Sequence, residues 1–256
     1  MTEARILTET RGATLIVTIS RPDRRNAMDA AAAHEIERAW DRLDDDPTLL
    51  AGIITGAGGV FSAGADLKAA ASGQPPARTA KRGFFGTISQ PPQKPILAAV
   101  EGDAFGGGFE LALACDLIIA SQSARFCLPE CRRGVLAVAG GAVRLPTKIP
   151  VNIAMEMALT GAPQPAARLY ALGLINVLCA PGEALATALS LANTIAANAP
   201  LAVAAAKRVV QAAAASSESA GWTRQQPEWD HLRGSADYHE GIAAFAEKRP
   251  PQWRGQ

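Results

Sequence analysis

The chain has 256 residues, of which 48% are hydrophobic, 19% charged and 5% aromatic, which is enough apolar material for a globular protein. Twenty-five lysines and arginines against 24 aspartates and glutamates leave a formal net charge of +1, so no overall field attracts nucleic acid or an anionic membrane. No signal-peptide pattern and no apolar run long enough to span a bilayer is present, which predicts a cytoplasmic location.

Short β-branched runs in the first half of the chain predict strands, with helices between them. The predicted strands are residues 14–20, 51–55, 96–100, 116–120 and 175–179. Asp29 is a predicted N-cap for a helix that runs to about Leu43. Its apolar face carries Ile36, Ala39 and Trp40. This alternation of strands and helices favours an α/β fold with mostly parallel pairing.

After residue 181 the pattern changes to helices alone. Residues 183–197 and 200–215 are rich in alanine, which favours helix. We therefore predict a core over residues 1–195 and a helical C-terminal subdomain over residues 196–256. Residues 69–95 contain several prolines and glycines and match no element, and a mobile lid is one interpretation of this segment.

Three segments are rich in glycine, at residues 56–59, 62–66 and 106–110. A dinucleotide-binding fingerprint that starts at Gly56 needs a glycine where Phe61 stands, and no Gly-Lys-Ser/Thr occurs, so no Rossmann or P-loop site is predicted. The first segment is interpreted as a turn after a strand. In the third, three glycines stand at the N-terminus of a predicted buried helix. Free N–H groups and the helix dipole favour an anionic oxygen there.

Glu110 lies in an apolar stretch, where an unpaired charge is unfavourable. An ion pair with Arg125 or Arg144 is one explanation. The other is chemistry, because Glu130 follows the next predicted strand and can reach the same cleft. Two carboxylates around one water share acid and base work, and burial raises the pKa of at least one of them.

The remaining reactive side chains form no recognisable site. The four cysteines lack metal-ligand spacing and are predicted to be reduced and mostly buried. The three histidines stand in polar segments, and the Gly-x-Ser-x-Gly nucleophile elbow is absent. We therefore predict neither a metal site nor a serine-hydrolase site.

Four ordered motifs carry a more specific signal. They are FSAGADL at residues 61–67, PILAAVEGDAFGGGFE at 95–110, CDLIIA at 115–120 and FCLPE at 126–130. Together they resemble the enoyl-CoA hydratase/isomerase (crotonase) superfamily, and the likeness extends over almost the whole chain. The resemblance implies a spiral of repeated ββα units and a helical C-terminal part that forms homotrimers, often paired into homohexamers.

The resemblance also implies an acyl-CoA thioester as substrate, so that coenzyme A enters with the substrate and no separate cofactor is expected. The thioester oxygen would be held in an oxyanion hole by the main-chain N–H groups that match Ala65 and Gly107. The residues implied in CoA binding are Arg24, Arg25, Ala63, Ala65, Asp66, Leu67 and Lys248. We expect the acyl pocket to be walled by Phe84, Phe85, Leu136 and Val138.

Hydratases of this superfamily use two glutamates, at positions that match Glu110 and Glu130. The implied reaction is reversible syn addition of water to a trans-2-enoyl-CoA, with Glu130 as proton donor to C2 and Glu110 as the residue that activates water. The pair is expected to titrate as a unit. The sequence departs from the common pattern at residues 127–128 and 137–138, where the Val138 N–H is expected to contact the water.

Three alternatives stay open at this point. A Δ3,Δ2-enoyl-CoA isomerase needs mainly one carboxylate, so Glu110 would be surplus. A carnitinyl-CoA-type dehydratase would run the reaction in reverse on a functionalised acyl group. A protein that binds acyl-CoA or RNA without catalysis belongs to another class, and the near-neutral charge disfavours RNA.

Overall fold

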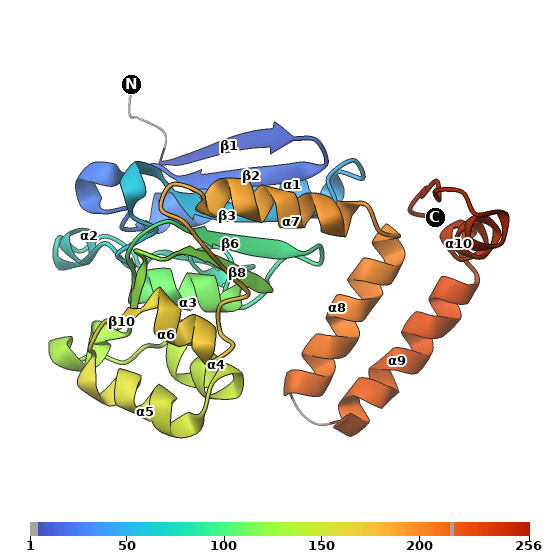
Figure 1. The fold of residues 1–256 in the computed structure, drawn as a ribbon. Helices are drawn as coiled ribbons and strands as arrows, with labels where there is room; N and C mark the ends of the chain where they lie inside the picture. Colours follow the sequence, from blue (N-terminus) through green and yellow to red (C-terminus); the bar gives the residue numbers. More distant parts are fainter. Residues whose placement is uncertain (1–4, 216–217) are drawn as a thin grey trace.

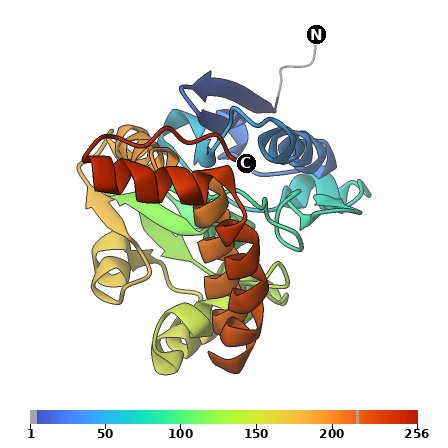
Figure 2. The same ribbon diagram turned by 90° about the vertical axis from the view of Figure 1, so that its right-hand side faces the viewer.

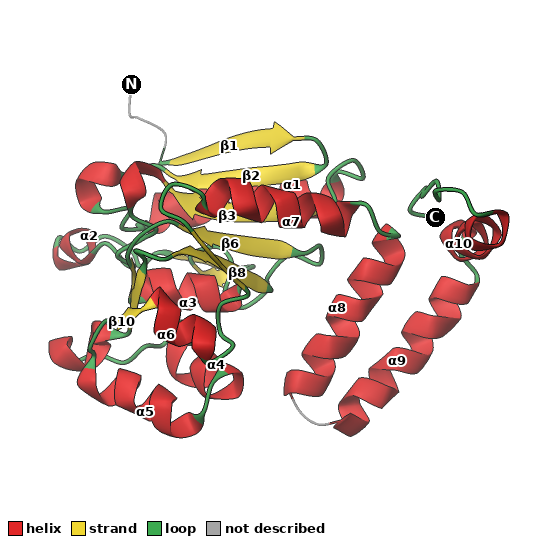
Figure 3. Cartoon of the chain, in the orientation of Figure 1, coloured by secondary structure: helices red, strands yellow, loops and turns green. Residues whose placement is uncertain are grey.

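The computed structural model describes residues 5–215 and 218–256. Its centre is a six-stranded sheet of order β1-β2-β3-β6-β8-β11, in which β1 alone pairs antiparallel (Figure 3). The strands are β1 (Ile6–Arg11), β2 (Thr14–Ile19), β3 (Ala51–Gly56), β6 (Ile96–Val100), β8 (Leu117–Ser121) and β11 (Val177–Cys179). All five predicted strands are confirmed, and so is the α/β class with mostly parallel pairing.

Two smaller sheets and ten helices complete the described part of the chain. The short strands are β4 (Arg78–Thr79), β5 (Gly83–Phe84), β7 (Ala104–Phe105), β9 (Arg125–Cys127) and β10 (Gln164–Pro165). The helices are α1 (Ala30–Asp45), α2 (Leu67–Ala71), α3 (Gly107–Ala114), α4 (Gly141–Lys148), α5 (Val151–Thr160), α6 (Ala166–Ala171), α7 (Ala184–Ala196), α8 (Pro200–Ala215), α9 (Glu218–Arg233) and α10 (Ala236–Glu247).

Alternation of side chains along the strands builds one core on each face of the sheet. Ile53 and Leu97 pack with Ala184, Ala188 and Ala192 of α7, which lies across the strands in Figure 1. These three alanines recur every four residues and so form one smooth face of the helix. On the opposite face, alternate strand residues pack against α1 and α3. Residues that point to both faces are apolar, as expected for buried parallel strands.

The N-cap that was predicted for α1 is confirmed, because the Asp29 side chain accepts a hydrogen bond from Ala32 N at 2.9 Å. The predicted buried face of Ile36, Ala39 and Trp40 is also confirmed. The four cysteines are free and three of them are buried, with Cys131 exposed.

The C-terminal helices extend beyond the sheet. α8 and α9 lie side by side, and α10 lies across this pair (Figures 1 and 2). Lys207 on α8 binds the core through the Asp116 carboxylate at 2.7 Å and the Pro92 and Lys94 carbonyls at 2.8 and 2.9 Å. The division into residues 1–195 and 196–256 stays a prediction. No single helix in the described residues is long and apolar enough to cross a membrane, although α7 and most of α8 together pass that test with a 108° bend between them.

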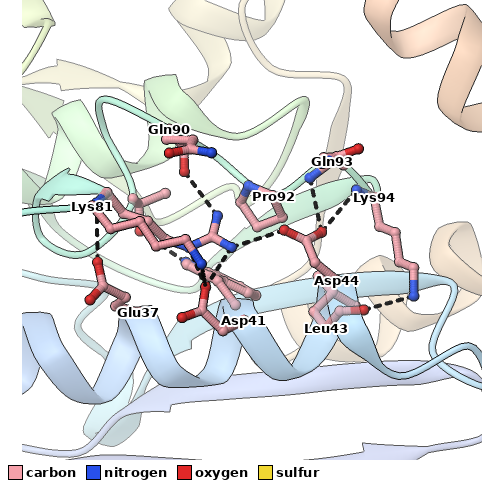
Figure 4. Close-up of polar contacts among 12 residues, drawn as sticks. Glu37, Asp41, Leu43, Asp44, Lys81, Gln90, Pro92, Gln93 and Lys94 are labelled. Carbon is pink, nitrogen blue, oxygen red and sulfur yellow. Dashed lines mark hydrogen bonds and ion pairs between the residues drawn. The ribbon is translucent and has the colours of Figure 1, made fainter.

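Residues 69–95, which matched no element in the sequence, are fastened to α1. The Arg82 side chain is 3% exposed and binds Asp41 at 2.8 Å and Asp44 at 2.9 Å, two carboxylates of α1 that face this segment in Figure 4. Arg82 also donates to the Gln90 carbonyl at 2.9 Å. Further along, Thr87 accepts a hydrogen bond from the Trp40 indole at 2.9 Å. This half of the segment is therefore part of the core rather than a lid that opens.

We expect Arg82→Met to lower the free energy of unfolding by about 2–4 kcal/mol, because it leaves the Asp41 and Asp44 carboxylates without their buried partner. Lys81→Met is the matched control. Lys81 binds the same Asp41 from a half-exposed position, and its loss is expected to cost less than about 1 kcal/mol. Urea unfolding of both variants measures the difference, and equal losses would show that Arg82 does not anchor the segment.

Candidate active site

A cavity of about 190 Å³ lies among the loops that follow the carboxyl ends of β3 and β6. This is the edge of a parallel sheet at which ligands commonly bind. The cavity brings together most of the residues singled out from the sequence. Those that line it are Ala63, Ala65, Asp66, Leu67, Phe84, Phe85, Gly107, Glu110, Glu130 and Val138.

Two loops meet at the wall of this cavity with their backbones in contact. Gly64 has φ +90°, and a Cβ added there would lie 2.6 Å from the Gly107 nitrogen, so only glycine allows this approach. Met28 donates to Gly64 O and accepts from Asp66 N, which leaves the N–H of Ala65 between them without a partner. Neither Ala65 nor Gly107, the first residue of α3, donates its N–H to another described residue. Two residues that line the cavity therefore carry backbone N–H groups that are not used by other described residues.

Phe85 covers one side of Gly107. Its ring occupies the place where a Cβ on Gly107 would stand. The side chain is 2% exposed, and its backbone has φ +53°, a left-handed conformation that is strained for phenylalanine. The ring therefore shapes the cavity at the point where the Gly107 N–H is presented.

Glu110 stands in the first turn of α3 and is 3% exposed. Burial raises the pKa of Glu110 to about 7, against an opposing hydrogen bond from the Gly141 N–H at 2.9 Å. The nearby Glu130 carboxylate raises this pKa further. A carboxyl group that titrates near neutral pH can take up or release a proton in the reaction.

The ion pair that was one explanation for Glu110 is not formed. Arg125 binds Asp103 at 2.8 Å, and Arg144 donates to the Ile88 carbonyl at 2.7 Å. Within residues 5–215 and 218–256, Glu110 has no ion-pair partner. The reason is that α4 begins at Gly141 directly against Glu110, so a backbone N–H meets the carboxylate in place of a guanidinium.

Glu130 lies opposite, in the 3₁₀ helix Pro129–Arg133. Burial raises its pKa also. Its Oε2 is buried and accepts no hydrogen bond from the described residues, whereas Oε1 lies 3.1 Å from the position of a Cβ on Gly106. A buried carboxyl oxygen without a partner is ready to bind a water or a ligand proton.

Two expectations about residues 136–138 need correction. The Val138 N–H donates to the Leu136 carbonyl at 2.8 Å, so it is not available to a water in the site. Leu136 is 67% exposed and does not line the cavity. The hydrogen bond closes a tight turn over residues 136–138. Within this turn the side chain of Val138 lines the cavity, that of Leu136 does not, and the Val138 N–H points back to Leu136.

Three of the charged residues expected to bind CoA, namely Arg24, Arg25 and Asp66, form ion pairs. Asp66 accepts from Ala69 N at 3.1 Å as the N-cap of α2, and it binds Arg21 at 3.0 Å and Arg24 at 3.2 Å. Arg25 binds Asp103 at 2.9 Å. Asp66 therefore fixes the loop and holds Arg24. Arg24 and Arg25 do not line the cavity.

Lys248 lies at the C-terminal end of α10, and α2 and α10 stand at opposite ends of the molecule in Figure 1. One chain alone thus does not bring Lys248 to the cavity.

The sequence reasoning missed several residues of the site. Arg21, which holds Asp66, and the cavity-lining Met28, Arg133 and Ala139 were not singled out, and Asp29 was singled out only as an N-cap. For Arg133 a signal existed, because it follows Glu130 by three residues. In the part of the chain that the structure describes, no cluster of three or more His, Cys, Asp or Glu side chains is arranged to hold a metal ion.

Known proteins share this fold and are similar in sequence over almost the whole chain. The sequence model of the family described as Enoyl-CoA hydratase/isomerase matches residues 9–256. A carnitinyl-CoA dehydratase of Proteus mirabilis is 42% identical over 254 residues, which cover 96% of this chain and 97% of that protein. The enoyl-CoA hydratase EchA19 of Mycobacterium tuberculosis is 39% identical and covers 98% of this chain and 96% of its own length.

Among solved structures, a crystal structure of enoyl-CoA hydratase from Mycobacterium tuberculosis H37Rv superposes with a TM-score of 0.95 at 47% identity. The superposition covers 99% of this chain and 100% of that one. These likenesses confirm the superfamily and the crotonase-like α/β fold that the motifs implied.

The raised pKa of Glu110 predicts a pH-dependent stability. Its pKa is about 7 in the folded protein and ordinarily 4.5, so the folded state binds this proton more tightly than the unfolded chain. Stability is therefore lost as the pH rises from about 4.5 to about 7. We expect Glu110→Gln to raise the free energy of unfolding by about 1–3 kcal/mol near pH 8 and to change it little near pH 4.5.

Urea unfolding at both pH values measures this effect, with Glu183→Gln, a change at an exposed glutamate, as a control. A gain of the same size at both pH values would point to packing rather than to the charge.

The contact between Phe85 and Gly107 predicts a coupled pair of substitutions. Gly107→Ala is expected to cost about 1–3 kcal/mol of stability, because the new methyl group meets the Phe85 ring. In the double variant with Phe85→Ala this clash is absent. The double variant should therefore lose less stability than the two single variants added together, by at least about 1 kcal/mol. Phe84→Ala in place of Phe85→Ala is the control, and additive losses in both pairs would contradict the contact.

Proposed function

The chain belongs to the enoyl-CoA hydratase/isomerase family, and on this premise we propose that it adds water reversibly to trans-2-enoyl-CoA thioesters to give 3-hydroxyacyl-CoA. One observation carries the proposal: Glu110 and Glu130, both with raised pKa, line a single cavity with two free backbone N–H groups. Acid, base and oxyanion donors are thus available at one place.

In this proposal the N–H groups of Ala65 and Gly107 bind the thioester oxygen. Negative charge develops on that oxygen when water attacks C3, and two fixed donors stabilise it without reorganisation. The end of α3 adds the positive pole of its dipole at Gly107. In other enzymes, loss of one such donor raises the activation free energy by about 3 kcal/mol.

The two carboxyl groups then move the protons. Glu110 accepts a proton from the water whose oxygen bonds to C3. The electrons of the double bond pass to the thioester oxygen, and the resulting enolate takes a proton at C2 from Glu130. Atoms and charge balance, because the two glutamates together lose one proton to C2 and gain one from water. Repulsion between the two carboxylates favours one shared proton on the pair near neutral pH.

The coenzyme A part of the substrate would lie along Ala63, Ala65 and Leu67, with Arg24 and Arg25 near its phosphates, and no separate cofactor is required. In one chain Arg24 and Arg25 are exposed and bind carboxylates. We further propose a homotrimer or homohexamer in the cytoplasm, in which Lys248 of a neighbouring copy reaches the CoA phosphates.

Exposed apolar side chains support an assembly through the C-terminal helices. Phe245 is 88% exposed, Ile242 55% and Trp229 43%, and all three line one apolar hollow on α9 and α10. Such a patch on a helical surface is typical of an interface between subunits.

The other functions explain fewer features of the site. An isomerase leaves the buried Glu110 without a use, and a binding protein needs neither carboxyl group. A carnitinyl-CoA dehydratase, the name of one 42% identical relative, uses the same chemistry in the reverse direction, so it differs from this proposal in the acyl group.

Turnover of trans-2-enoyl-CoA thioesters of increasing length tests the proposal, with products identified by mass. We expect Glu110→Gln and Glu130→Gln each to lower kcat at least about 100-fold, because each removes a proton-transfer group. Glu156→Gln is the control, because this half-buried glutamate binds Arg168 and does not line the cavity. Conversion of 3-enoyl-CoA without any hydration would favour the isomerase, and full activity in both variants would refute the mechanism.

A further inference from the structure

The cavity wall carries one positive charge, that of the exposed Arg133, which forms no ion pair or hydrogen bond among the described residues, although it lowers the pKa of the nearby Glu130. Its charged lining residues are Asp29, Asp66, Glu110, Glu130 and Arg133. The two aspartates bind arginines outside the cavity, and the two glutamates are the proposed acid and base. Arg133 makes neither an ion pair nor a side-chain hydrogen bond within residues 5–215 and 218–256, although it lies in the same wall as these carboxyl groups.

The 3₁₀ helix Pro129–Arg133 explains the position of this arginine. Side chains three residues apart eclipse one another in a 3₁₀ helix, so Arg133 lies on the same side as Glu130. Gly134 ends the helix with φ +67° and donates its N–H to the Glu130 carbonyl, which fixes the last turn. Arg132 is turned away and donates to the Thr160 carbonyl at 2.8 Å.

Arg133 belongs to the acyl side of the cavity rather than to the CoA side. The segment 63–67, proposed to bind CoA, follows β3, whereas Arg133 follows Glu130, whose proposed target is C2 of the acyl group. Val135, Val138 and Ala139, which follow Arg133 in the chain, also line the cavity, and their side chains are apolar. A purely apolar acyl chain gains nothing from a guanidinium in this place, whereas a carboxylate can accept two parallel hydrogen bonds from it.

We propose that the preferred substrates are 2-enoyl-CoA thioesters whose acyl chain ends in a carboxylate, and that Arg133 is the residue that selects them. This inference rests on the proposed hydratase function and narrows its substrate class. The same charge would repel a cationic acyl group, so we expect thioesters of that kind to be poor substrates.

Two thioesters of equal length test the selection by turnover. The ratio of kcat/KM for trans-2-hexenedioyl-CoA to that for trans-2-hexenoyl-CoA is measured in the wild type, Arg133→Gln and Arg133→Lys. We expect Arg133→Gln to lower this ratio about 10- to 100-fold and Arg133→Lys to retain part of it, as a charge-assisted hydrogen bond is lost or replaced. Arg132→Gln, which leaves Arg133 in place, should keep the wild-type ratio.

A binding measurement keeps the test independent of catalysis. Calorimetric titration with hexanedioyl-CoA and hexanoyl-CoA, the saturated analogues, should show tighter binding of the dicarboxylic thioester to the wild type and no preference in Arg133→Gln. Equal binding of the two analogues to the wild type would overturn the inference. Equal weakening of both by Arg133→Gln would also overturn it, since Arg133 would then contact the CoA phosphates.

The two proposals fail in different ways. If the wild type hydrates neither thioester but still prefers the dicarboxylic analogue in binding, the hydratase function is refuted and the selection by Arg133 stands. If both thioesters are hydrated with a ratio that Arg133→Gln leaves unchanged, the hydratase function stands and the selection is refuted.

Discussion

Glu110 places a carboxyl group inside a helix whose every residue is buried, and no described cation neutralises it. Desolvation of the charged form raises its pKa, and backbone N–H groups of Gly141 and Ala139 offset part of that penalty. The start of α4 must therefore pass directly over α3, and a Cβ on Gly141 would come within 3.1 Å of the Glu110 Cγ and 2.9 Å of the Leu128 Cδ2. The central sheet and α1 hold α3 in place from the other side. The unfavourable burial of the Glu110 carboxyl group thus determines how α3 and α4 pack together.

Backbone contact gives the rest of the site its shape. The loops at Gly64 and Gly107 approach each other more closely than side chains would allow, and the Phe85 ring fills the space that glycine leaves at Gly107. Phe85 keeps its strained backbone because the residues on both sides of it are fastened to α1, through Arg82 before it and Thr87 after it. The anchored segment 69–95 therefore contributes a rigid wall to the cavity. A stable scaffold of this kind keeps donors and carboxyl groups in position before substrate binds.

Features that depend on neighbouring residues could be predicted from the sequence, whereas contacts between residues far apart in the chain could not. The strand at 96–100 and the N-cap at Asp29 depend on neighbouring residues, so their patterns were sufficient. β1 escaped prediction because Leu7 to Arg11 face solvent and show no apolar alternation. The pairing of Glu110 with the Gly141 N–H, and of Asp66 with Arg21, joins residues 31 and 45 positions apart, which no local pattern encodes. The site residues were identified by motif resemblance, whereas their partners required the three-dimensional structure.

Both edges of the central sheet have features that disfavour pairing with a strand of another molecule. β1 leaves one side of its backbone unpaired, but five of its six residues are exposed and Glu9 binds Arg11 across that edge strand at 2.7 Å. At the other edge β11 is only three residues long. Charged side chains and a short strand discourage the edge-to-edge stacking that leads to aggregation. Growth of the sheet from one copy to the next is thereby disfavoured at both edges.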